Sequence, residues 1–234
     1  MANQELAALS AEISGCRRCP RLVAWRENVA RTKVARHAGE TYWGRPVAGY
    51  GDPSARLWIV GLAPAAHGGN RTGRVFTGDR SGDFLYRALY GAGFCNQPSS
   101  VAIDDGLTLF DLYVSAVVRC APPDNRPLPE EFAACRPFLG REFRALTRLS
   151  LVLALGGVAY REYRKMLASV LPPPLPSFPP FSHGASVPAS RGLPAVLACY
   201  HPSARNTQTG LLTPAMMGEI LGRARTMLGQ STHP

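Results

Sequence analysis

Four of the six cysteines have a spacing that suits metal binding. Cys16 and Cys19 form a C-x-x-C pair, and Cys120 and Cys135 stand at the two ends of CAPPDNRPLPEEFAAC. Four thiolates from two segments can close a tetrahedral zinc site or hold an iron–sulfur cluster, and the spacing fits both equally well. Unliganded thiols are a third alternative. We expect a structural site, because a fully ligated metal leaves no open position for a substrate.

The glycine-rich stretch GLAPAAHGGNRTGR, residues 61–74, is a second segment of chemical interest. It follows the apolar run RLWIV, and a glycine-rich turn after a strand is where an α/β protein places its ligand. The stretch holds no carboxylate, no phosphate-loop lysine and no nucleophile before Asn70 and Arg71. Its small residues let the backbone approach a ligand closely. The groups that act on the ligand must therefore come from other segments.

The elements that would position these residues alternate along the chain. Apolar runs predict strands at 57–61, 112–118, 151–155 and 195–199, and helical patterns occupy 5–13, 22–35, 83–90, 129–149, 158–171 and 213–228. Such alternation is typical of an α/β fold, and we expect a three-layer α/β/α sandwich with a mostly parallel four-stranded sheet. Ligands bind at the carboxyl ends of such strands, where GLAPAAHGGN, RCAPPDNRP, LGGVAY and YHPSARNTQTG follow.

Length and charge limit the classes of protein that fit. The 234 residues suit one domain, 1–234, with a flexible tail from about residue 229. The net charge of +10 predicts binding to a polyanion, nucleic acid first. No apolar stretch is long enough to cross a bilayer, and we recognise no signal peptide. We therefore expect a cytoplasmic, nucleoid-associated monomer with reduced thiols and no membrane partner.

In combination, GLAPAAHGGNRTGRVFTGD, VRCAPPDNRPLP, YHPSARNTQTG and the four cysteines resemble the uracil-DNA glycosylase superfamily over residues 16–213. The sequence is most similar to its iron–sulfur members of the family 5 type, also called type b. The resemblance implies a structural [4Fe–4S] cluster on Cys16, Cys19, Cys120 and Cys135, in preference to zinc. It also implies a hydrolase that excises uracil from DNA and thereby initiates base excision repair.

Two departures from the superfamily pattern affect the expected chemistry. Most members carry an acid or Asn in the first motif, where this chain has Ala63, Pro64 and Ala65. Relatives also carry an Asn that pairs with uracil where Ala116 stands here, beside Ser115. Both departures are features of the family 5 type and imply a pocket that also accepts hypoxanthine or xanthine. The missing acid motivates an alternative, a non-catalytic module that binds damaged DNA.

The resemblance implies roles for several residues around a base flipped out of the duplex. His201 would stabilise the negative charge on the departing base. Asp79 is the carboxylate nearest in sequence and would orient the attacking water, and Asn125 is the other candidate, for the water or for the base edge. A helix cap is the alternative for Asp79, and a turn position is the alternative for Asn125. The expected base-binding residues are Gly61, Leu62 and Ala63 through their backbone, Phe76 through stacking, and Ser115. An ordinary core position is the alternative for Phe76.

Polar residues near these motifs are expected to contact the rest of the DNA. Arginines in neighbouring loops would bind phosphates, and the polar segment after His201 would fill the gap that the flipped nucleotide leaves. The expected residues are Arg71, Arg74 and Arg126 for phosphates, and Arg205, Asn206 and Gln208 for the gap. Solvated surface charge is the alternative for each arginine.

Overall fold

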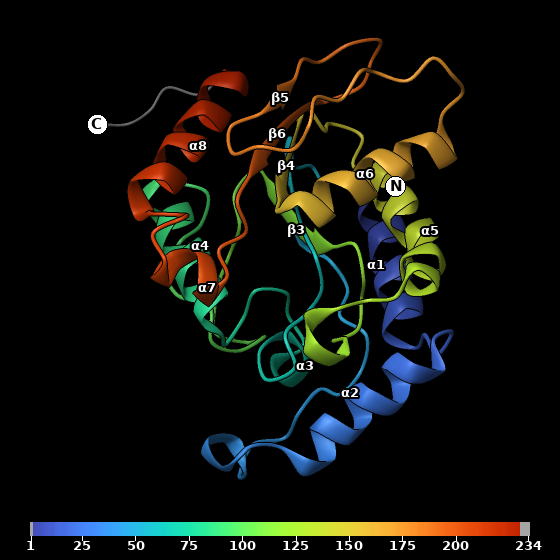
Figure 1. Ribbon diagram of the computed structural model, residues 1–234, viewed down its shortest axis with the longest axis vertical. Coiled ribbons are helices and arrows are strands. Elements are labelled where there is room, and N and C mark those ends of the chain that lie inside the picture. The colour runs from blue at the N-terminus through green and yellow to red at the C-terminus, as the bar shows by residue number, and fades with distance from the viewer. Residues whose placement is uncertain (1, 230–234) are drawn as a thin grey trace.

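In the computed structural model, which describes residues 2–229, helices cover both faces of a central sheet (Figure 1). The strand order is β1-β3-β2-β4-β6-β5. The four inner strands are parallel, namely β2 (Leu57–Gly61), β3 (Leu112–Ala116), β4 (Leu151–Leu155) and β6 (Ala195–Cys199). The predicted α/β/α sandwich is thus confirmed.

The sheet has six strands, so the predicted number of four is wrong. β1 (Tyr50–Gly51) pairs antiparallel with β3, and β5 (Ser186–Val187) pairs antiparallel with β6. Each of these edge strands has two residues, and so short a segment shows no alternation of apolar and polar side chains. The four predicted runs are the inner strands, with β3 ending at Ala116 rather than at residue 118.

Six helices occupy the regions where the sequence predicts them. They are α1 (Ala2–Ser14), α2 (Pro20–Thr32), α4 (Arg80–Gly91), α5 (Pro129–Ala145), α6 (Gly157–Val170) and α8 (Pro214–Met227). Short helical turns lie in the connections: η1 (Ala35–His37), α3 (Gly69–Thr72), η2 (Pro123–Asn125) and α7 (Ala204–Gln208). The polar segment after His201, for which the sequence predicts no helix, thus contains a short one, and the Ser203 hydroxyl caps it by accepting from the Asn206 N–H.

The inner strands are buried on both faces, as parallel strands covered by helices must be. Ile59 belongs to a core with Leu85 of α4 and Leu221 of α8, on one side of the sheet. On the other side Trp58 belongs to a core with residues of α5 and α6, and its ring lies edge-on to Tyr163. The two cores hold the sheet rigid between the helical layers.

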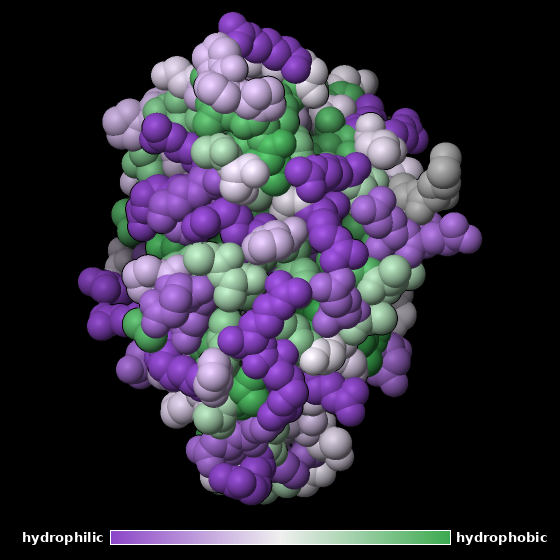
Figure 2. All heavy atoms as spheres, turned by 90° about the vertical axis from the view of Figure 1, so that its right-hand side faces the viewer, coloured by the Kyte–Doolittle hydropathy of each residue, from purple (hydrophilic) through white to green (hydrophobic). Residues whose placement is uncertain are grey.

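The carboxyl ends of the parallel strands meet at one edge of the sheet, where α3, η2 and α7 gather (Figure 1). α2 extends beyond this edge and is followed by η1. Figure 2 views the molecule from the side of α1, α5 and α6, where hydrophilic side chains are interspersed with small apolar patches. None of the helices in residues 2–229 has both the length and the hydropathy of a membrane span. Apart from Gly229, the tail predicted from residue 229 lies outside the described residues.

Candidate active site

A cleft of about 800 Å³ opens at the carboxyl edge of the sheet. Segments from five parts of the chain contribute to it. The lining residues are Arg36, His37, Leu62, Ala63, Ala65, Phe76, Gly78, Asp79, Arg80, Ser81, Asp83, Asn125, His201, Ser203, Ala204 and Arg205. The three side chains expected to act in chemistry, those of Asp79, Asn125 and His201, are thus brought together although they are far apart in the sequence.

Phe76 and His201 lie next to each other in the cleft. Their ring centroids are 5.9 Å apart and their planes are tilted by 34°. Phe76 is held at φ 53°, a strained backbone conformation for an aromatic residue that is typical of functional sites. Burial lowers the pKa of His201 to about 4, so that its imidazole is neutral at neutral pH.

Three glycines make room for these side chains. A Cβ on Gly61 would lie 2.7 Å from Cζ of Phe76, and one on Gly156 would lie 3.2 Å from Cβ of His201. A Cβ on Gly68 would lie 2.1 Å from Oδ2 of Asp79. Contacts below 3 Å are not tolerated without movement, so Gly61 and Gly68 fix how closely the ring and the carboxylate approach the backbone.

Asp79 is both the N-cap of α4 and a lining residue of the cleft. Its Oδ1 accepts a hydrogen bond of 3.0 Å from the Gly82 N–H. Burial raises the pKa of its carboxyl, against the opposing effect of the Gly82 and Ser81 N–H groups. The two interpretations of this residue do not exclude each other, because one oxygen caps the helix and the carboxylate still faces the cleft.

Asn125 reaches the cleft from a tight turn. Asp124 and Asn125 have φ values of 53° and 56°, and short polar residues adopt such left-handed conformations most readily. No hydrogen bond of the Asn125 side-chain amide to a described residue is present, so this amide is available to a ligand. Asn125 is therefore a turn residue whose side-chain amide also lines the cleft, so the two interpretations are compatible.

The loop after β2 presents unpaired backbone amides to the cleft. The carbonyl oxygens of Gly61 and Leu62 accept from Val117 and Val118 at 3.0 Å each. The N–H groups of Leu62 and Ala63, by contrast, donate to no backbone carbonyl among residues 2–229. Two free donors beside Phe76 suit the carbonyl oxygens of a base.

Ser115 does not line the cleft, so its expected contact with the base is not supported. Its side chain is fully buried: the hydroxyl accepts from Trp58 Nε1 at 2.9 Å and donates to Glu142 Oε2 at 2.8 Å. Glu142 in turn forms a buried ion pair with Arg119. A period of two along β3 directs alternate side chains to opposite faces, and Ser115 belongs to the α5 side of the sheet.

Two of the predicted phosphate-binding arginines are engaged elsewhere. Arg74 is 4% exposed and binds Asp105 and the hydroxyls of Thr77 and Ser100. Arg71 pairs with Glu40, and its Nε and Nη2 donate to the carbonyl oxygens of His67 and Gly78. Both guanidiniums stabilise the loops of the site, because buried charges must be paired. The sequence does not predict these partners of Arg71 and Arg74, because Glu40 and Asp105 are distant along the chain.

The other predicted DNA-contacting residues differ in how free they are. Arg126, Arg205 and Gln208 are exposed, and Arg205 lines the cleft. The side-chain amide of Asn206 donates to the His201 carbonyl at 2.9 Å, so this residue holds the histidine loop in place. Sequence reasoning missed Arg36, His37 and Arg80, which also line the cleft, because no motif distinguishes them from surface charge.

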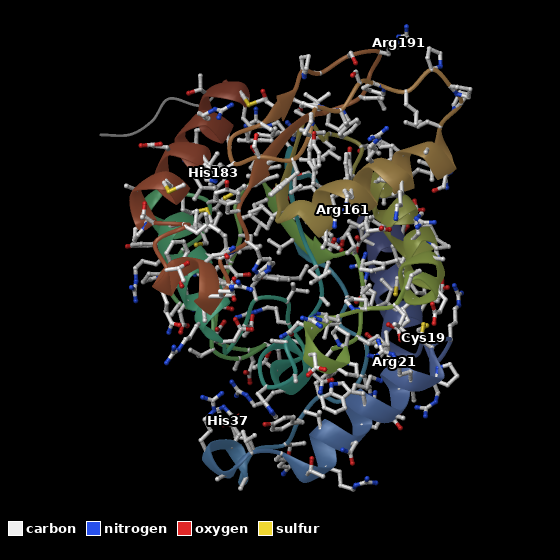
Figure 3. All side chains as sticks on the ribbon, viewed as in Figure 1. Cys19, Arg21, His37, Arg161, His183 and Arg191 are labelled. Atoms are coloured by element: carbon white, nitrogen blue, oxygen red, sulfur yellow. The ribbon has the colours of Figure 1, made fainter. Side chains whose placement is uncertain are left out.

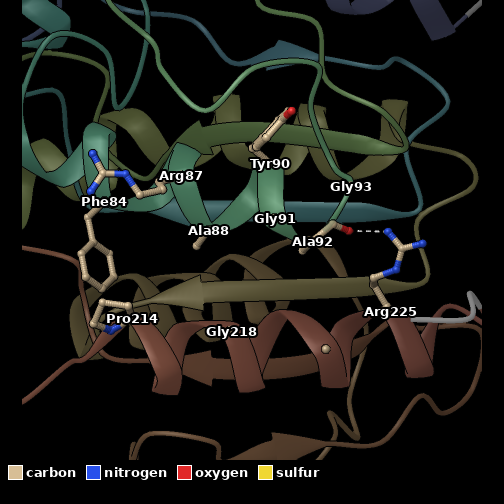
Figure 4. Close-up of a pocket in the computed structure, with 11 residues that line it drawn as sticks. Phe84, Arg87, Ala88, Tyr90, Gly91, Ala92, Gly93, Pro214, Gly218 and Arg225 are labelled. Carbon is tan, nitrogen blue, oxygen red and sulfur yellow. Dashed lines mark hydrogen bonds between the residues drawn. The ribbon is translucent and has the colours of Figure 1, made fainter. Parts of the chain in front are cut away.

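A second cavity of about 540 Å³ lies between α4 and α8 and shares no residue with the cleft (Figure 4). Small residues such as Ala88 and Gly218 line it, together with Phe84, Tyr90 and the Arg225 guanidinium, which donates to the Ala92 carbonyl. Its lining contains no carboxylate, histidine or thiol. The cavity therefore lacks the groups that the chemistry of the cleft requires.

The four spaced cysteines line one small cavity together with Arg26 and Arg119. Cys19 stands where α1 and α2 meet beside α5, which carries Cys135 (Figure 3). Nη1 of Arg26 donates to Cys120 Sγ at 2.9 Å, whereas Nε of Arg26 and Nε and Nη1 of Arg119 are buried without partners. Within residues 2–229, no three His, Cys, Asp or Glu side chains are arranged to hold a single metal ion.

The fold and the cleft define a class of protein. This class has an α/β/α sandwich with a cleft at the carboxyl ends of its strands, and a neutral histidine, a carboxylate and an aromatic ring line the cleft here. Residues 48–225 match the family model of the uracil DNA glycosylase superfamily. The chain belongs to this superfamily and, within it, to the type-5 uracil-DNA glycosylases.

Three curated relatives illustrate the match. The type-5 uracil-DNA glycosylase of Mycobacterium tuberculosis is 47% identical over 225 residues, 96% of this chain and 82% of the relative. That of Mycobacterium leprae is 48% identical over 224 residues, 94% of this chain and 95% of the relative. That of Thermus thermophilus is 48% identical over 217 residues, 93% of this chain and 95% of the relative.

Proposed function

We propose that this protein excises uracil from DNA by hydrolysing its N-glycosidic bond. The observation that carries the proposal is the convergence of Asp79, Asn125 and His201 beside Phe76 in one cleft. Relatives named type-5 uracil-DNA glycosylases cover nearly the whole chain and support the same activity.

The cleft would bind a base that has been flipped out of the duplex. The ring of Phe76 offers a stacking surface, which any base can use. The unpaired N–H groups of Leu62 and Ala63 would then donate to the carbonyl oxygens of the base. These contacts orient the base so that its glycosidic bond lies toward the polar part of the cleft.

His201 would stabilise the base as it departs with the bonding electron pair. Because burial lowers its pKa to about 4, the imidazole is neutral and acts as a hydrogen-bond donor rather than as a general acid. A positioned donor beside a growing negative charge stabilises the transition state more than the substrate. The base leaves as an anion and takes its proton later from solvent.

Asp79 and Asn125 would serve the attacking water. The carboxylate of Asp79 would orient the water and offset the positive charge on the sugar, and the amide of Asn125 would hold the same water or the base edge. Water supplies the oxygen for the new bond to the sugar carbon, and one of its protons is released. The products are the free base and an abasic site.

The same cleft would accept other deaminated bases. The Ser115 hydroxyl binds Trp58 and Glu142 instead, the side chain of Ala116 is apolar, and the proposed contacts to the base come from backbone amides and a ring. Uracil, hypoxanthine and xanthine each offer a carbonyl oxygen and a stacking face. We therefore include hypoxanthine and xanthine among the substrates of the proposed reaction.

Duplexes with a single uracil, hypoxanthine or xanthine test the activity, with alkaline cleavage of the abasic product as the readout. Release of uracil supports the proposal, and release of hypoxanthine or xanthine supports its wider form. Tight binding to these duplexes without release of any base would favour the alternative, a non-catalytic module. A His201→Ala variant that is folded but excises uracil much more slowly ties the activity to this cleft.

We also propose that the four cysteines hold a [4Fe–4S] cluster. Their shared cavity is bordered by two guanidiniums with unpartnered N–H groups, and such donors suit the sulfurs of an anionic cluster. The thiolates of such a cluster each bind a separate iron. The cluster would tie α1 and α2 to α5 and would take no part in the reaction.

Iron and sulfide content and the visible absorption spectrum of the purified protein test this assignment. We expect four irons per chain, and loss of the spectrum in Cys120→Ala but not in Cys199→Ala. Cys199 is the matched control because it is also a buried cysteine but lies in β6, outside the cysteine cavity. A colourless protein with stoichiometric zinc would contradict the cluster.

A further inference from the structure

Three arginines at the rim of the cleft have exposed guanidiniums. Arg36, Arg80 and Arg205 are exposed, line the cleft and come from three separate segments. Within the described part of the chain, no carboxylate pairs with any of the three and no acceptor binds their guanidiniums. Nearby, the guanidiniums of Arg71 and Arg74 are fully engaged by protein groups. The rim therefore carries three guanidiniums without an ion-pair partner among residues 2–229, in a cleft that the carboxylates of Asp79 and Asp83 also line.

Arg36 is carried by a segment that we call the arm, residues 33–40. The arm follows α2 and includes η1, and His37 marks its place at the lower end of the molecule in Figure 3. Its chain is held in shape internally: Lys33 Nζ donates to the Ala38 carbonyl at 3.1 Å, and His37 Nδ1 lies 2.6 Å from Glu40 Oε1. The arm is thus a defined structure rather than a loose loop.

Glu40 and Arg71 fasten the arm to the site. The Glu40 carboxylate contacts both His37 and the Arg71 guanidinium, and Nη2 of Arg71 donates to the Gly78 carbonyl at 3.0 Å. Gly78 directly precedes Asp79, so one guanidinium joins the arm to the loop that carries the carboxylate. Further along, the Trp43 N–H donates to the Arg71 carbonyl at 2.8 Å.

These contacts indicate what the free arginines bind. Phosphates of a strand whose base enters a cleft must lie at its rim, and unpaired guanidiniums are their usual partners. We propose that Arg36 and Arg80 bind phosphates of the damaged DNA strand next to the flipped nucleotide, with Arg36 presented by the arm. The proposal rests on the proposed function in taking DNA as the ligand, but it does not depend on base release.

The salt dependence of DNA binding tests whether Arg36 and Arg80 bind phosphates. Arg36→Gln and Arg80→Gln are compared with Arg191→Gln, which removes the same charge at the opposite end of the molecule (Figure 3). Affinity for a duplex with a tetrahydrofuran abasic site is measured by fluorescence anisotropy between 50 and 200 mM NaCl. Each rim variant should weaken binding and make the slope of log K against log salt less negative by about 0.9. Arg191→Gln should leave the slope unchanged.

Neutral methylphosphonates placed at single positions of the damaged strand locate the contacts. For the wild type, a substitution at either of two phosphates next to the abasic site should weaken binding. The methylphosphonate at the phosphate that Arg36 contacts should not weaken DNA binding by the Arg36→Gln variant any further. Equal salt slopes for the rim variants and Arg191→Gln would overturn the proposal. So would additive effects of the arginine variant and the methylphosphonate at every phosphate. If the wild type does not excise uracil but the rim variants still differ from it in salt slope, the proposed function is rejected and the phosphate contacts stand.

Glu40→Gln tests whether Glu40 positions the arm. Removing an acid from a DNA-binding protein ordinarily strengthens binding, and Glu27→Gln, which also breaks an exposed ion pair, is the control for that effect. If Glu40 holds the arm over the cleft, Glu40→Gln should instead weaken binding and reduce the salt slope as Arg36→Gln does. Tighter binding by Glu40→Gln would overturn this positioning role.

Discussion

The phenyl ring of Phe76 and the imidazole of His201 adjoin in the cleft, with centroids 5.9 Å apart. One residue follows β2 and the other follows β6, and each approaches a glycine that has no side chain to obstruct it. The pair places a stacking surface beside a hydrogen-bond donor. A base that lies on Phe76 can therefore present its edge to His201.

His201→Ala should lower the single-turnover rate of uracil excision by about 10²- to 10³-fold, the usual effect of losing one donor to a developing negative charge. His183→Ala is the control, because His183 stacks on Tyr200 but does not line the cleft. Circular dichroism and thermal unfolding establish that both variants fold. Equal effects of the two changes on the rate would contradict the role of His201.

The pH dependence of stability should also report on His201. Its pKa falls from 6.5 to about 4 on folding, so the unfolded chain binds the proton first as the pH drops. The stabilisation is complete above pH 6.5 and is lost between pH 6.5 and pH 4, by up to about 3 kcal/mol. Urea unfolding at several pH values should show a steeper decline for the wild type than for His201→Gln. Parallel curves would show that this histidine is not buried in its neutral form.

Two substitutions of Asp79 should separate its capping role from its catalytic role. Asn is as good an N-cap as Asp, so Asp79→Asn should keep the stability of α4 while losing the charge that acts on water. Asp79→Ala should lose about 1 kcal/mol of stability as well. We expect both variants to excise uracil far more slowly than the wild type. A fully active Asp79→Asn variant would show that Asp79 only caps α4, and the role in positioning the water would then be assigned to Asn125.

Gly61→Ala should displace the stacking ring. The new methyl group would lie 2.7 Å from the Phe76 ring, which is fixed in the core, and such overpacking typically costs about 1–3 kcal/mol. Gly222→Ala on α8 is the matched control, because its methyl group meets nothing within 4 Å and Ala favours the helix. The midpoint temperature of unfolding and the rate of uracil excision should fall for Gly61→Ala and stay unchanged for Gly222→Ala.

Ser115→Ala should affect stability rather than base preference. The hydroxyl is bonded to Trp58 and Glu142, and its loss leaves buried groups without a partner at a cost of about 1–3 kcal/mol. The ratio of uracil to hypoxanthine excision should stay that of the wild type. A changed ratio would mean that Ser115 reaches the base after all.

Much of the fold could be predicted because its elements are encoded locally. The runs at 57–61, 151–155 and 195–199 are strands with those bounds, and the six longer helices follow their apolar periodicity. The edge strands β1 and β5 could not be found, because a pair of residues is fixed by its neighbour across the sheet. α7 was missed for a similar reason: its polar residues form a helix only once Ser203 caps them.

The sequence by itself determined the residue types at the ends of the strands, and with them His201, Asp79, Asn125 and Phe76 as candidates. Only the tertiary structure decided which side chains reach the cleft. Ser115 turns to Glu142, Arg74 turns to Asp105, and Arg36 enters from a segment without a motif. Burial and ion pairing depend on neighbours that are distant in the sequence, and these interactions choose between a buried partner and an open site.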